Sequence, residues 1–144
     1  MGRVGLTAAV VGGAGYIGGE LLRLVLGHPE LRLVQATSDS QAGRPVPSVH
    51  PNLRHLTSMQ FTAHDAVEPA DVIFLALPHG EVLPRLAALA AKARIVVDLS
   101  ADFRLRDPAA HARWYGATHP DPELGERFVP GLPEIGRASC RERV

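Results

Sequence analysis

The sequence predicts an α/β fold, in which helices cover an open, doubly wound and mostly parallel sheet. Two observations support this prediction. Short apolar runs of strand length alternate with segments of helical periodicity along the chain, an order that is typical of β-α-β units. The run at 72–77 is apolar throughout, as expected for a central parallel strand that is covered on both faces.

The first two strands and the helix between them are predicted from local signals. Leu6–Val11 is a short apolar run, and helical periodicity then continues from Gly15 to Gly27, which offers a C-cap before Pro29. Leu31–Thr37 follows as a second strand. Because a segment of helix length connects the two strands, we expect them to be parallel, with a right-handed crossover.

The middle of the chain is expected to hold a long loop and one further helix. Residues 38–51 are polar and rich in Gly, Pro and Ser, which predicts a loop. Met59–Ala63 alternates in polarity and suggests a strand toward the edge of the sheet. After the buried strand at Asp71–Leu77, a helix is predicted over 81–92, with Pro84 tolerated in its first turn.

The last strand is expected at Arg94–Leu99. Asp107 and Pro108 then predict the N-cap and the first position of a short helix, which ends near Gly116. The stretch 119–133 is rich in proline and has no periodicity, so we expect an extended loop there.

A glycine-rich turn, Gly12-Gly13-Ala14-Gly15-Tyr16-Ile17-Gly18, joins the first strand to the first helix. Strand, glycine turn and helix form the usual context of a phosphate-binding loop. Gly12 permits a sharp turn, Gly15 permits close approach of a pyrophosphate, and Gly18 permits close packing of the helix on the sheet. The first amides of the helix and its dipole favour an anion. The turn therefore predicts dinucleotide binding on a Rossmann-type sheet, and a tight βα turn without a ligand is the alternative.

Polar residues after the second strand are candidates for contacts with the cofactor ribose. Asp39 lies roughly where an acidic residue accepts the ribose hydroxyls of NAD, about 20 residues beyond the glycine turn. Ser38, Ser40 and Arg44 could instead bind the 2′-phosphate of NADP, which Asp39 would repel. A solvated loop whose side chains cap local backbone is the third possibility.

Two further strand ends carry polar residues. His79 follows the strand at 71–77. It could contact the substrate or the cofactor, or it could be a structural histidine of the turn. After the last strand, Ser100 is suited to the nicotinamide amide and Arg104 to a phosphate or carboxylate, unless Arg104 pairs with Asp102 to fix the loop. Because ligands of such sheets bind beyond the carboxyl ends of the strands, we expect the four segments at 12–18, 37–40, 77–80 and 99–104 to line one crevice.

The composition excludes several classes of protein. Lys+Arg and Asp+Glu are equal at 15 each, so no global field attracts nucleic acid or an anionic membrane. No apolar stretch approaches the roughly 20 residues of a membrane span, and no signal-peptide pattern precedes the glycine turn. The single cysteine, Cys140, excludes an internal disulfide framework and suits a reducing, cytoplasmic compartment.

The chain resembles N-acetyl-gamma-glutamyl-phosphate reductase, which is related to aspartate-semialdehyde dehydrogenase. The resemblance covers residues 8–134 and is most specific at 97–104, Val-Asp-Leu-Ser-Ala-Asp-Phe-Arg. Its other parts are the glycine turn, Leu77-Pro78-His79-Gly80, and the landmarks Trp114-Tyr115, His119-Pro120 and Gly131-Leu132-Pro133-Glu134, together with Thr37-Ser38, Ser40 and Ala42-Gly43.

The resemblance implies an NADP-dependent oxidoreductase of arginine biosynthesis that reduces an acyl phosphate to an aldehyde. It places Gly12, Gly15 and Gly18 at the pyrophosphate, Ser38 and Ser40 near the adenosine ribose, Ser100 near the nicotinamide and Arg104 at the substrate phosphate. With the reasoning above, the candidate cofactor-binding residues are Gly12, Gly13, Ala14, Gly15, Tyr16, Ile17, Gly18, Ser38, Ser40, Arg44, Pro78, His79 and Ser100. The family usually has a basic residue where this chain has Asp39, which weakens the expectation of NADP over NAD, and Arg44 could compensate.

The resemblance also shapes the expected domain organisation. Residues 1–134 are expected to form a dinucleotide-binding domain, whose part from about 107 onward leads to a catalytic domain absent from this sequence. That domain would carry the nucleophilic cysteine and the acid/base histidine, so no catalytic residue and no metal site are predicted here. Residues 135–144 resemble a non-native tail, and Cys140 in it is not proposed as the nucleophile. The fragment is expected to be inactive alone, and the full-length enzyme to act on a small molecule as a homo-oligomer.

Three alternative functions share the glycine turn. A short-chain dehydrogenase would need a Tyr-x-x-x-Lys pair, but Tyr115 is followed at that spacing by His119 and Tyr16 by Glu20, and the only lysine is Lys92. A sister reductase of the aspartate-semialdehyde dehydrogenase type and a nucleotide-binding module without catalysis both stay open, because the substrate-reading residues are expected elsewhere.

Overall fold

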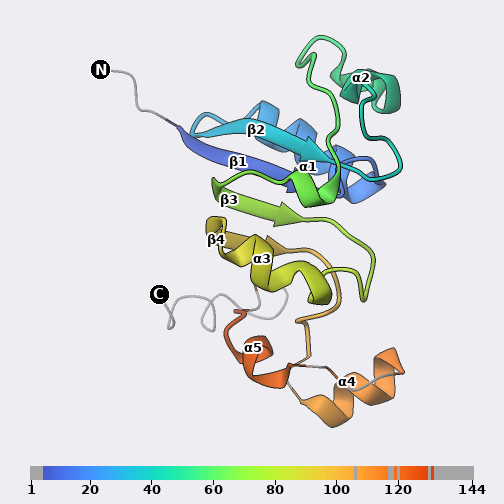
Figure 1. Ribbon diagram of the computed structural model, residues 1–144, viewed down its shortest axis with the longest axis vertical. Coiled ribbons are helices and arrows are strands. Elements are labelled where there is room, and N and C mark those ends of the chain that lie inside the picture. The colour runs from blue at the N-terminus through green and yellow to red at the C-terminus, as the bar shows by residue number, and fades with distance from the viewer. Residues whose placement is uncertain (1–4, 106, 117–118, 120, 130, 132–144) are drawn as a thin grey trace. The chain divides into compact units, whose positions relative to one another are not determined.

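The computed structural model describes residues 5–105, 107–116, 119, 121–129 and 131 of the 144-residue chain. These residues form two compact units that divide between Leu99 and Ser100 (Figure 1). The first unit contains the sheet and the glycine turn. Within the described ranges, no helix combines the length and the hydropathy needed to cross a bilayer.

Four parallel strands form the sheet of the first unit, in the order β2-β1-β3-β4. They are β1 (Leu6–Val11), β2 (Leu31–Thr37), β3 (Ala70–Leu75) and β4 (Ala93–Asp98). The predicted parallel α/β sheet is therefore confirmed, and all four strands lie within two residues of their expected positions. Because every strand runs in the same direction, the carboxyl ends of all four lie at one edge of the sheet.

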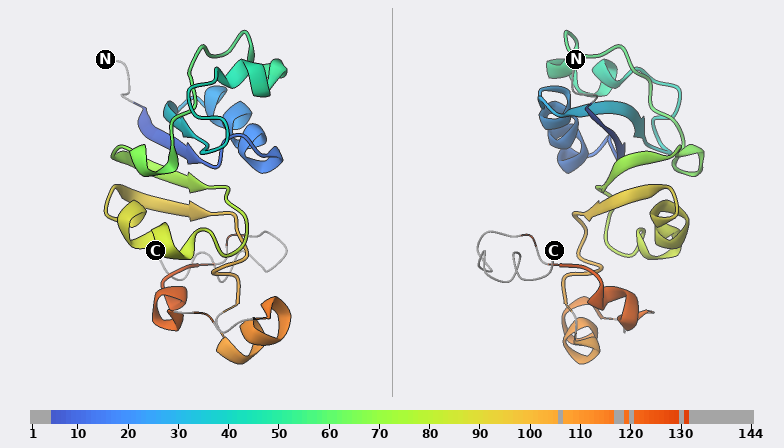
Figure 2. Two further views of the ribbon diagram at one scale, coloured as in Figure 1. Left: turned by 45° about the vertical axis from the view of Figure 1, so that its right-hand side comes forward. Right: turned by 90° about the vertical axis from the view of Figure 1, so that its left-hand side faces the viewer.

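Helices cover both faces of this sheet. Helix α1 (Tyr16–Leu26) lies on one side and α3 (Leu86–Ala90) on the other, as the edge-on view of Figure 2 shows. Gly15 is the N-cap of α1 and Gly27 its C-cap, and the C-cap is as predicted. The buried residues of α1 are Gly18, Gly19, Leu22 and Val25, so the helix rests on the sheet along a stripe that begins with two glycines.

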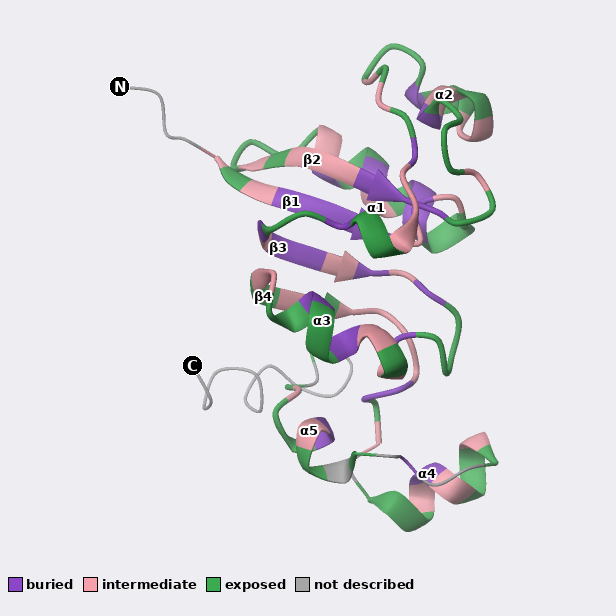
Figure 3. Cartoon of the chain, viewed as in Figure 1, coloured by how far each residue is buried: buried purple, intermediate pink, exposed green. Residues whose placement is uncertain are grey.

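A core cluster of the first unit lies between α1, the sheet and the connection from β2 to β3. Its buried members are Val10, Leu22, Ala36, Val46, Leu53 and Phe61. Figure 3 shows buried stretches, in purple, in β1 and near α2. Half of the buried members of the cluster come from the connection, which therefore belongs to the core. This arrangement corrects the expectation of a plain loop over 38–51, since α2 (Val46–Val49) and a 3-10 turn, η1 (Pro51–Leu53), form where Val46 and Leu53 are buried.

Met59–Ala63 forms no strand, contrary to the prediction. Only two isolated bridges occur here, between Thr62 and Thr37 and between Gln60 and Pro45. The alternation has a different cause, because Phe61 points into the core cluster while its backbone bonds to Arg44 and Gly43. The segment thus fastens the loop after β2 without extending the sheet.

The helix predicted over 81–92 is broken into two pieces. A 3-10 turn, η3 (Leu83–Arg85), precedes α3, and Pro84 lies within that turn. Proline has no N–H and its ring crowds the preceding turn, which accounts for the tighter start. Val82, Leu86 and Leu89 are the buried side chains of this segment.

The second unit contains two short helices around a small aromatic cluster. Helix α4 (Pro108–Tyr115) begins and ends as predicted, with the Asp107 side chain accepting from the Ala109 amide and Gly116 in the left-handed region. Helix α5 (Pro122–Glu126) corrects the expected loop over 119–133, because the Asp121 side chain caps it by accepting from the Leu124 amide. The expected tail, 135–144, lies outside the described residues.

Rings from three parts of this unit meet in the cluster. Phe103 stacks on Phe128 with ring centroids 4.1 Å apart, and the His119 ring meets the Phe103 ring edge-on at 5.3 Å. His111 on α4 lies 5.2 Å from His119 and is buried. Phe103, in the loop after β4, is thereby packed against His119, which follows α4, and Phe128, which follows α5.

Candidate functional site

The glycine turn is fixed to the ends of the two neighbouring strands. Gly12 has φ +86°, and the amides of Gly12 and Gly13 both donate to the Thr37 carbonyl at the end of β2, at 3.1 and 2.8 Å. A Cβ on Gly12 would lie 2.5 Å from the Ala76 carbonyl oxygen beyond β3. Only glycine fits this position, as the sequence predicts, because both the φ angle and the space exclude a side chain.

Gly18 has the packing role that its position predicts. A Cβ there would lie 2.1 Å from the Gly12 carbonyl oxygen and 2.7 Å from the Gly13 Cα, both in the turn itself. Gly15 is different, since its Cβ would meet nothing nearer than the Gly12 carbonyl oxygen at 3.8 Å. The outer side of the turn at Gly15 is therefore open to an approaching group.

The amides that follow the turn are available to a ligand. No backbone acceptor in the described part of the chain receives the amides of Ala14, Tyr16 or Ile17. The N-cap of α1 is Gly15, which has no side chain that could accept a hydrogen bond from these amides. Unpaired N–H groups at a helix start, where the helix dipole is positive, suit a phosphate or diphosphate.

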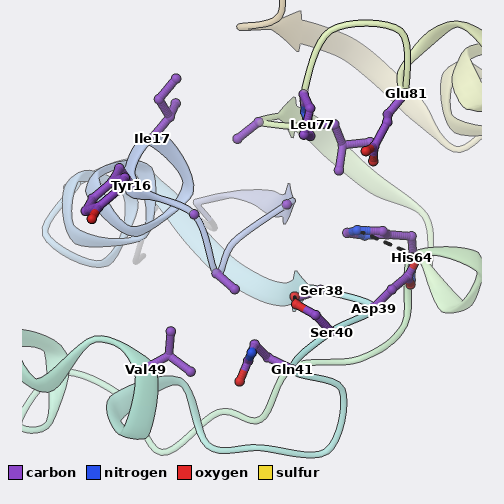
Figure 4. Close-up of a pocket in the computed structure, with 15 residues that line it drawn as sticks. Tyr16, Ile17, Ser38, Asp39, Ser40, Gln41, Val49, His64, Leu77 and Glu81 are labelled. Carbon is purple, nitrogen blue, oxygen red and sulfur yellow. Dashed lines mark hydrogen bonds and ion pairs between the residues drawn. The ribbon is translucent and has the colours of Figure 1, made fainter.

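Ala14, Tyr16 and Ile17, which carry these amides, line a cavity of about 670 Å³ at the carboxyl edge of the sheet (Figure 4). Its lining residues are Gly12, Ala14, Gly15, Tyr16, Ile17, Ser38, Asp39, Ser40, Gln41, Val49, His64, Ala76, Leu77, Pro78 and Glu81. Three of the four predicted segments thus meet here: the glycine turn, the loop after β2 and the loop after β3. Gly13 and Gly18 lie beneath the turn and support it without lining the cavity.

The serines after β2 lie together on the wall of the cavity. Ser38 is nearly buried, and its amide donates to the Thr62 carbonyl at 2.8 Å, while Ser40 is exposed. Their hydroxyl oxygens are 3.3 Å apart. Two neighbouring hydroxyls on an anchored loop can donate to the ribose or its phosphate.

Asp39 is held by residues from later in the chain. Its Oδ1 accepts from the His64 amide at 2.7 Å, and its Oδ2 lies 3.6 Å from Arg85 Nη2 and 4.0 Å from His64 Nε2. The residues come from the loop after β2, from η2 (His64–Ala66) and from η3. The sequence suggests Asp39 as a ribose contact, but it does not indicate that His64 and Arg85 are its partners.

His64 is the main residue of the cavity that the sequence did not reveal. Its ring is 9% exposed, and Nδ1 lies 2.7 Å from the Thr37 hydroxyl. Burial lowers the pKa of His64, and Arg85 adds to this effect, whereas the carboxylates of Asp39, Glu81 and Asp65 oppose it. The neutral imidazole is therefore favoured beside the cavity. No local motif marks this histidine, because β2 and η2 meet only in the folded chain.

Arg44 and His79, two further predicted cofactor contacts, do not line the cavity. Arg44 Nη1 donates to Gln41 Oε1 at 2.7 Å on the exposed side of the loop. His79 is exposed on the turn after β3, while its neighbour Pro78 does line the cavity. Gln41, Val49 and Glu81 are lining residues that the sequence analysis missed.

Ser100 and Arg104 belong to the second unit. The Ser100 hydroxyl accepts from the Asp102 amide at 3.1 Å, and the exposed Arg104 donates through its amide to the Ala101 carbonyl at 3.2 Å. Asp102 itself is fully buried. The assignments of Ser100 to the nicotinamide and Arg104 to a substrate phosphate stay predictions.

The described residues hold no group of three His, Cys, Asp or Glu side chains suited to a metal ion. The cavity offers main-chain amides of the glycine turn and serine hydroxyls as hydrogen-bond donors, and the carboxylates of Asp39 and Glu81 as acceptors. The donors at the glycine turn suit an anionic group.

Comparison with known proteins agrees with this arrangement. Residues 7–143 match the family profile described as semialdehyde dehydrogenase, NAD binding domain. The chain is 50% identical over 135 residues to the LysW-L-2-aminoadipate 6-phosphate reductase of Deinococcus radiodurans, covering 94% of this chain and 39% of the relative. It is 46% identical over 140 residues to the N-acetyl-gamma-glutamyl-phosphate reductase of Nitrosococcus oceani, covering 95% of this chain and 41% of the relative.

Among solved structures, the aspartate semialdehyde dehydrogenase of Candida albicans with NADP has a similar fold. The TM-score is 0.55 at 17% identity, over 81% of this chain and 40% of that chain. The chain thus spans about two fifths of the length of the relatives it matches. The family resemblance stated from the sequence is confirmed: this chain belongs to the semialdehyde dehydrogenase family and carries its NAD-binding domain.

Proposed function

We propose that this chain is the cofactor-binding part of an NADPH-dependent acyl-phosphate reductase. In the full-length enzyme, the reaction converts N-acetyl-γ-glutamyl phosphate, NADPH and a proton into N-acetylglutamate semialdehyde, phosphate and NADP⁺, a step of arginine biosynthesis. One observation carries the proposal: Ala14, Tyr16 and Ile17, whose amides have no backbone acceptor among the described residues, line the same cavity as Ser38 and Ser40.

The residues around the cavity fit a dinucleotide. A diphosphate offers only acceptors, and the amides at the start of α1 offer donors on a backbone that is open at Gly15. The ribose-side wall carries the Ser38 and Ser40 hydroxyls 3.3 Å apart. When bound, NADPH supplies the hydride. The role of this chain's residues is to bind the diphosphate and ribose and so to orient the cofactor toward the substrate.

The remaining parts of the site are proposals that rest on the family. Ser100 would contact the nicotinamide amide and Arg104 the phosphate of the substrate. A cysteine thiolate and an acid/base histidine would come from the portion that the relatives have in addition. This chain spans 39% and 41% of two of them, which leaves room for such a domain.

A second candidate substrate is a carrier-bound aminoadipate phosphate. It is favoured by one observation, the 50% identity to a relative named for LysW-L-2-aminoadipate 6-phosphate, against 46% to the relative named for N-acetyl-gamma-glutamyl phosphate. Both substrates are acyl phosphates that are reduced to a semialdehyde. The cavity at the glycine turn is compatible with either substrate, because the ligand proposed for it is the cofactor.

Binding and turnover test the proposal separately. Fluorescence titration with NADPH should give saturable binding, and Gly15→Ala should weaken it. The full-length enzyme should form NADPH from NADP⁺, phosphate and N-acetylglutamate semialdehyde in the reverse assay. Turnover only with the LysW-linked semialdehyde would favour the second candidate, and absence of nucleotide binding would refute both.

A further inference from the structure

The carboxylate of Asp39 is already engaged on the side away from the glycine turn. Its Oδ1 receives the His64 amide at 2.7 Å, and its Oδ2 faces Arg85 Nη2 at 3.6 Å. A second cavity of about 460 Å³ lies on this side, and Asp39 and His64 form a wall common to both cavities. Arg85 lines the second cavity only.

An acidic residue at this position normally selects NAD. Its carboxylate accepts the 2′- and 3′-hydroxyls of the ribose, and it repels the 2′-phosphate of NADP. Both effects require a carboxylate with free oxygens and an uncompensated charge. Both are reduced at Asp39, because the His64 amide occupies one acceptor site of Oδ1 and the Arg85 guanidinium faces Oδ2, although the Asp39 side chain is 55% exposed.

We propose that Arg85 determines the cofactor preference of this protein by neutralising Asp39, so that the 2′-phosphate of NADP is accepted beside an acidic residue. The inference rests on the proposed function, since it concerns the ribose end of the same cofactor site. Arg85 acts through Asp39 and is a positioning residue. Ser38 and Ser40 then supply hydroxyl donors for the phosphate on the wall of the first cavity.

The surroundings of Arg85 are consistent with this role. Its Nε is buried and has no hydrogen-bond partner among the described residues, and its side chain is 40% exposed. Asp39 is the only ion-pair partner of Arg85 among the pairs found in the described ranges. Arg44, the cation that the sequence suggests instead, is bonded to Gln41 on the exposed side of the loop.

The size of the effect follows from Coulomb's law. At water-like dielectric, a phosphate dianion near one uncompensated carboxylate loses about tenfold in affinity, and salt reduces this loss. Removing the guanidinium should therefore weaken NADPH binding about tenfold at low salt and leave NADH binding equal or tighter.

A double-mutant cycle on the full chain tests the proposal. Dissociation constants of NADPH and NADH are measured for the parent protein, Arg85→Gln, Asp39→Asn and the double variant. Arg85→Gln should shift the preference toward NADH, and Asp39→Asn should shift it toward NADPH. In the Asp39→Asn background, Arg85→Gln should have no further effect on NADPH.

Further variants distinguish an effect of the Arg85 charge on cofactor preference from an effect on folding. Arg85→Lys keeps the charge and should keep the preference for NADPH, while Arg32→Gln, at an exposed arginine on β2, should change neither constant. Thermal melting checks that each variant is folded.

The alternatives give different results. An equal loss of NADPH affinity with and without Asp39 would overturn the proposal in favour of direct contact between Arg85 and the phosphate. A shift with Arg44→Gln but not with Arg85→Gln would overturn it in favour of Arg44. Equal losses of NADPH and NADH affinity in Arg85→Gln would also overturn it. If the parent protein binds neither nucleotide, the proposed function fails first, and this inference fails with it.

Discussion

The His50 side chain lies beneath the glycine turn, with its Nε2 2.8 Å from the Gly13 carbonyl oxygen. A carbonyl only accepts, so Nε2 carries the proton in this contact. The same ring occupies the space that a side chain at residue 19 would need, since a Cβ on Gly19 would lie 2.4 Å from it. His50 thus directs the Gly13 carbonyl away from the ligand side of the turn, and the following amides face the cavity.

His50→Ala should weaken both the fold and the cofactor site. The lost hydrogen bond and the space left beside Gly19 should lower the free energy of unfolding by about 1–2 kcal/mol. NADPH binding should weaken as well, because the turn is no longer fixed. His50→Gln keeps an N–H donor and should recover part of the binding. Chemical denaturation and NADPH titration measure the two effects, and His55→Ala, at an exposed histidine of the same segment, is the matched control. Equal behaviour of the His50 and His55 variants would contradict this role.

Two alanine substitutions in the glycine turn should have opposite signatures. Gly18→Ala places a Cβ 2.1 Å from the Gly12 carbonyl oxygen, so the helix must move and stability should fall by more than 1 kcal/mol, within the range of about 1–3 kcal/mol for overpacked sites. Gly15→Ala meets nothing closer than 3.8 Å, so the fold should keep its stability while the methyl group hinders a diphosphate. Melting curves and NADPH titrations of both variants test this contrast. Strong NADPH binding by Gly15→Ala would place the diphosphate elsewhere.

The stability of the protein should decrease on mild acidification because of His64. Burial lowers the pKa of His64 from its ordinary value of 6.5, so the unfolded chain takes up a proton at a higher pH than the folded chain does. The free energy of unfolding contributed by the neutral ring is therefore complete above about pH 6.5 and is lost as the pH falls toward the folded pKa. Urea denaturation at about pH 7.5 and about pH 5.5 should show this decrease, and His64→Gln should reduce it. The same pH dependence in His64→Gln would assign the effect to another group.

At lower pH, the hydrogen bonds between Thr7 and Asp71 should dominate the pH dependence of the free energy of unfolding. The backbone amide and then the hydroxyl of Thr7 donate to the Asp71 carboxylate at 2.9 and 2.8 Å and lower its pKa below 3.8. The stability from this depressed pKa is present above the unfolded value and is lost as the pH falls through the folded one. Thr7→Val keeps the shape but removes the hydroxyl, so acid unfolding should begin at a higher pH. An unchanged acid transition, followed by circular dichroism, would show that the hydroxyl has no such effect.

The parts of the fold with strong local signals could be predicted from the sequence. Apolar runs predict β1 and β3, paired glycines predict both ends of α1, and Asp107-Pro108 predicts the start of α4. The prediction failed at Met59–Ala63, where the pattern of a strand reflects the burial of Phe61 alone. It also missed α5, because a single capping residue, Asp121, outweighs the proline-rich composition.

The candidate site divides in the same way. The glycine turn and the serines after β2 are contiguous in sequence and follow a strand, so they can be recognised locally. His50, His64 and Arg85 reach the site through contacts with residues that lie 37, 27 and 46 positions away, and no nearby residue marks them. Whether Asp39 favours NAD or NADP could not be decided from the sequence, because the answer depends on which cation faces it in three dimensions.

The contact between His50 and Gly13 also has a consequence for how the protein acquires its ability to bind. The turn is completed by a residue 37 positions downstream, held in place by Phe61 and the rest of the β2–β3 connection. Closing so long a loop is slow compared with forming a single helix. During refolding, recovery of nucleotide affinity should therefore lag behind helix formation and coincide with burial of the crossover segment.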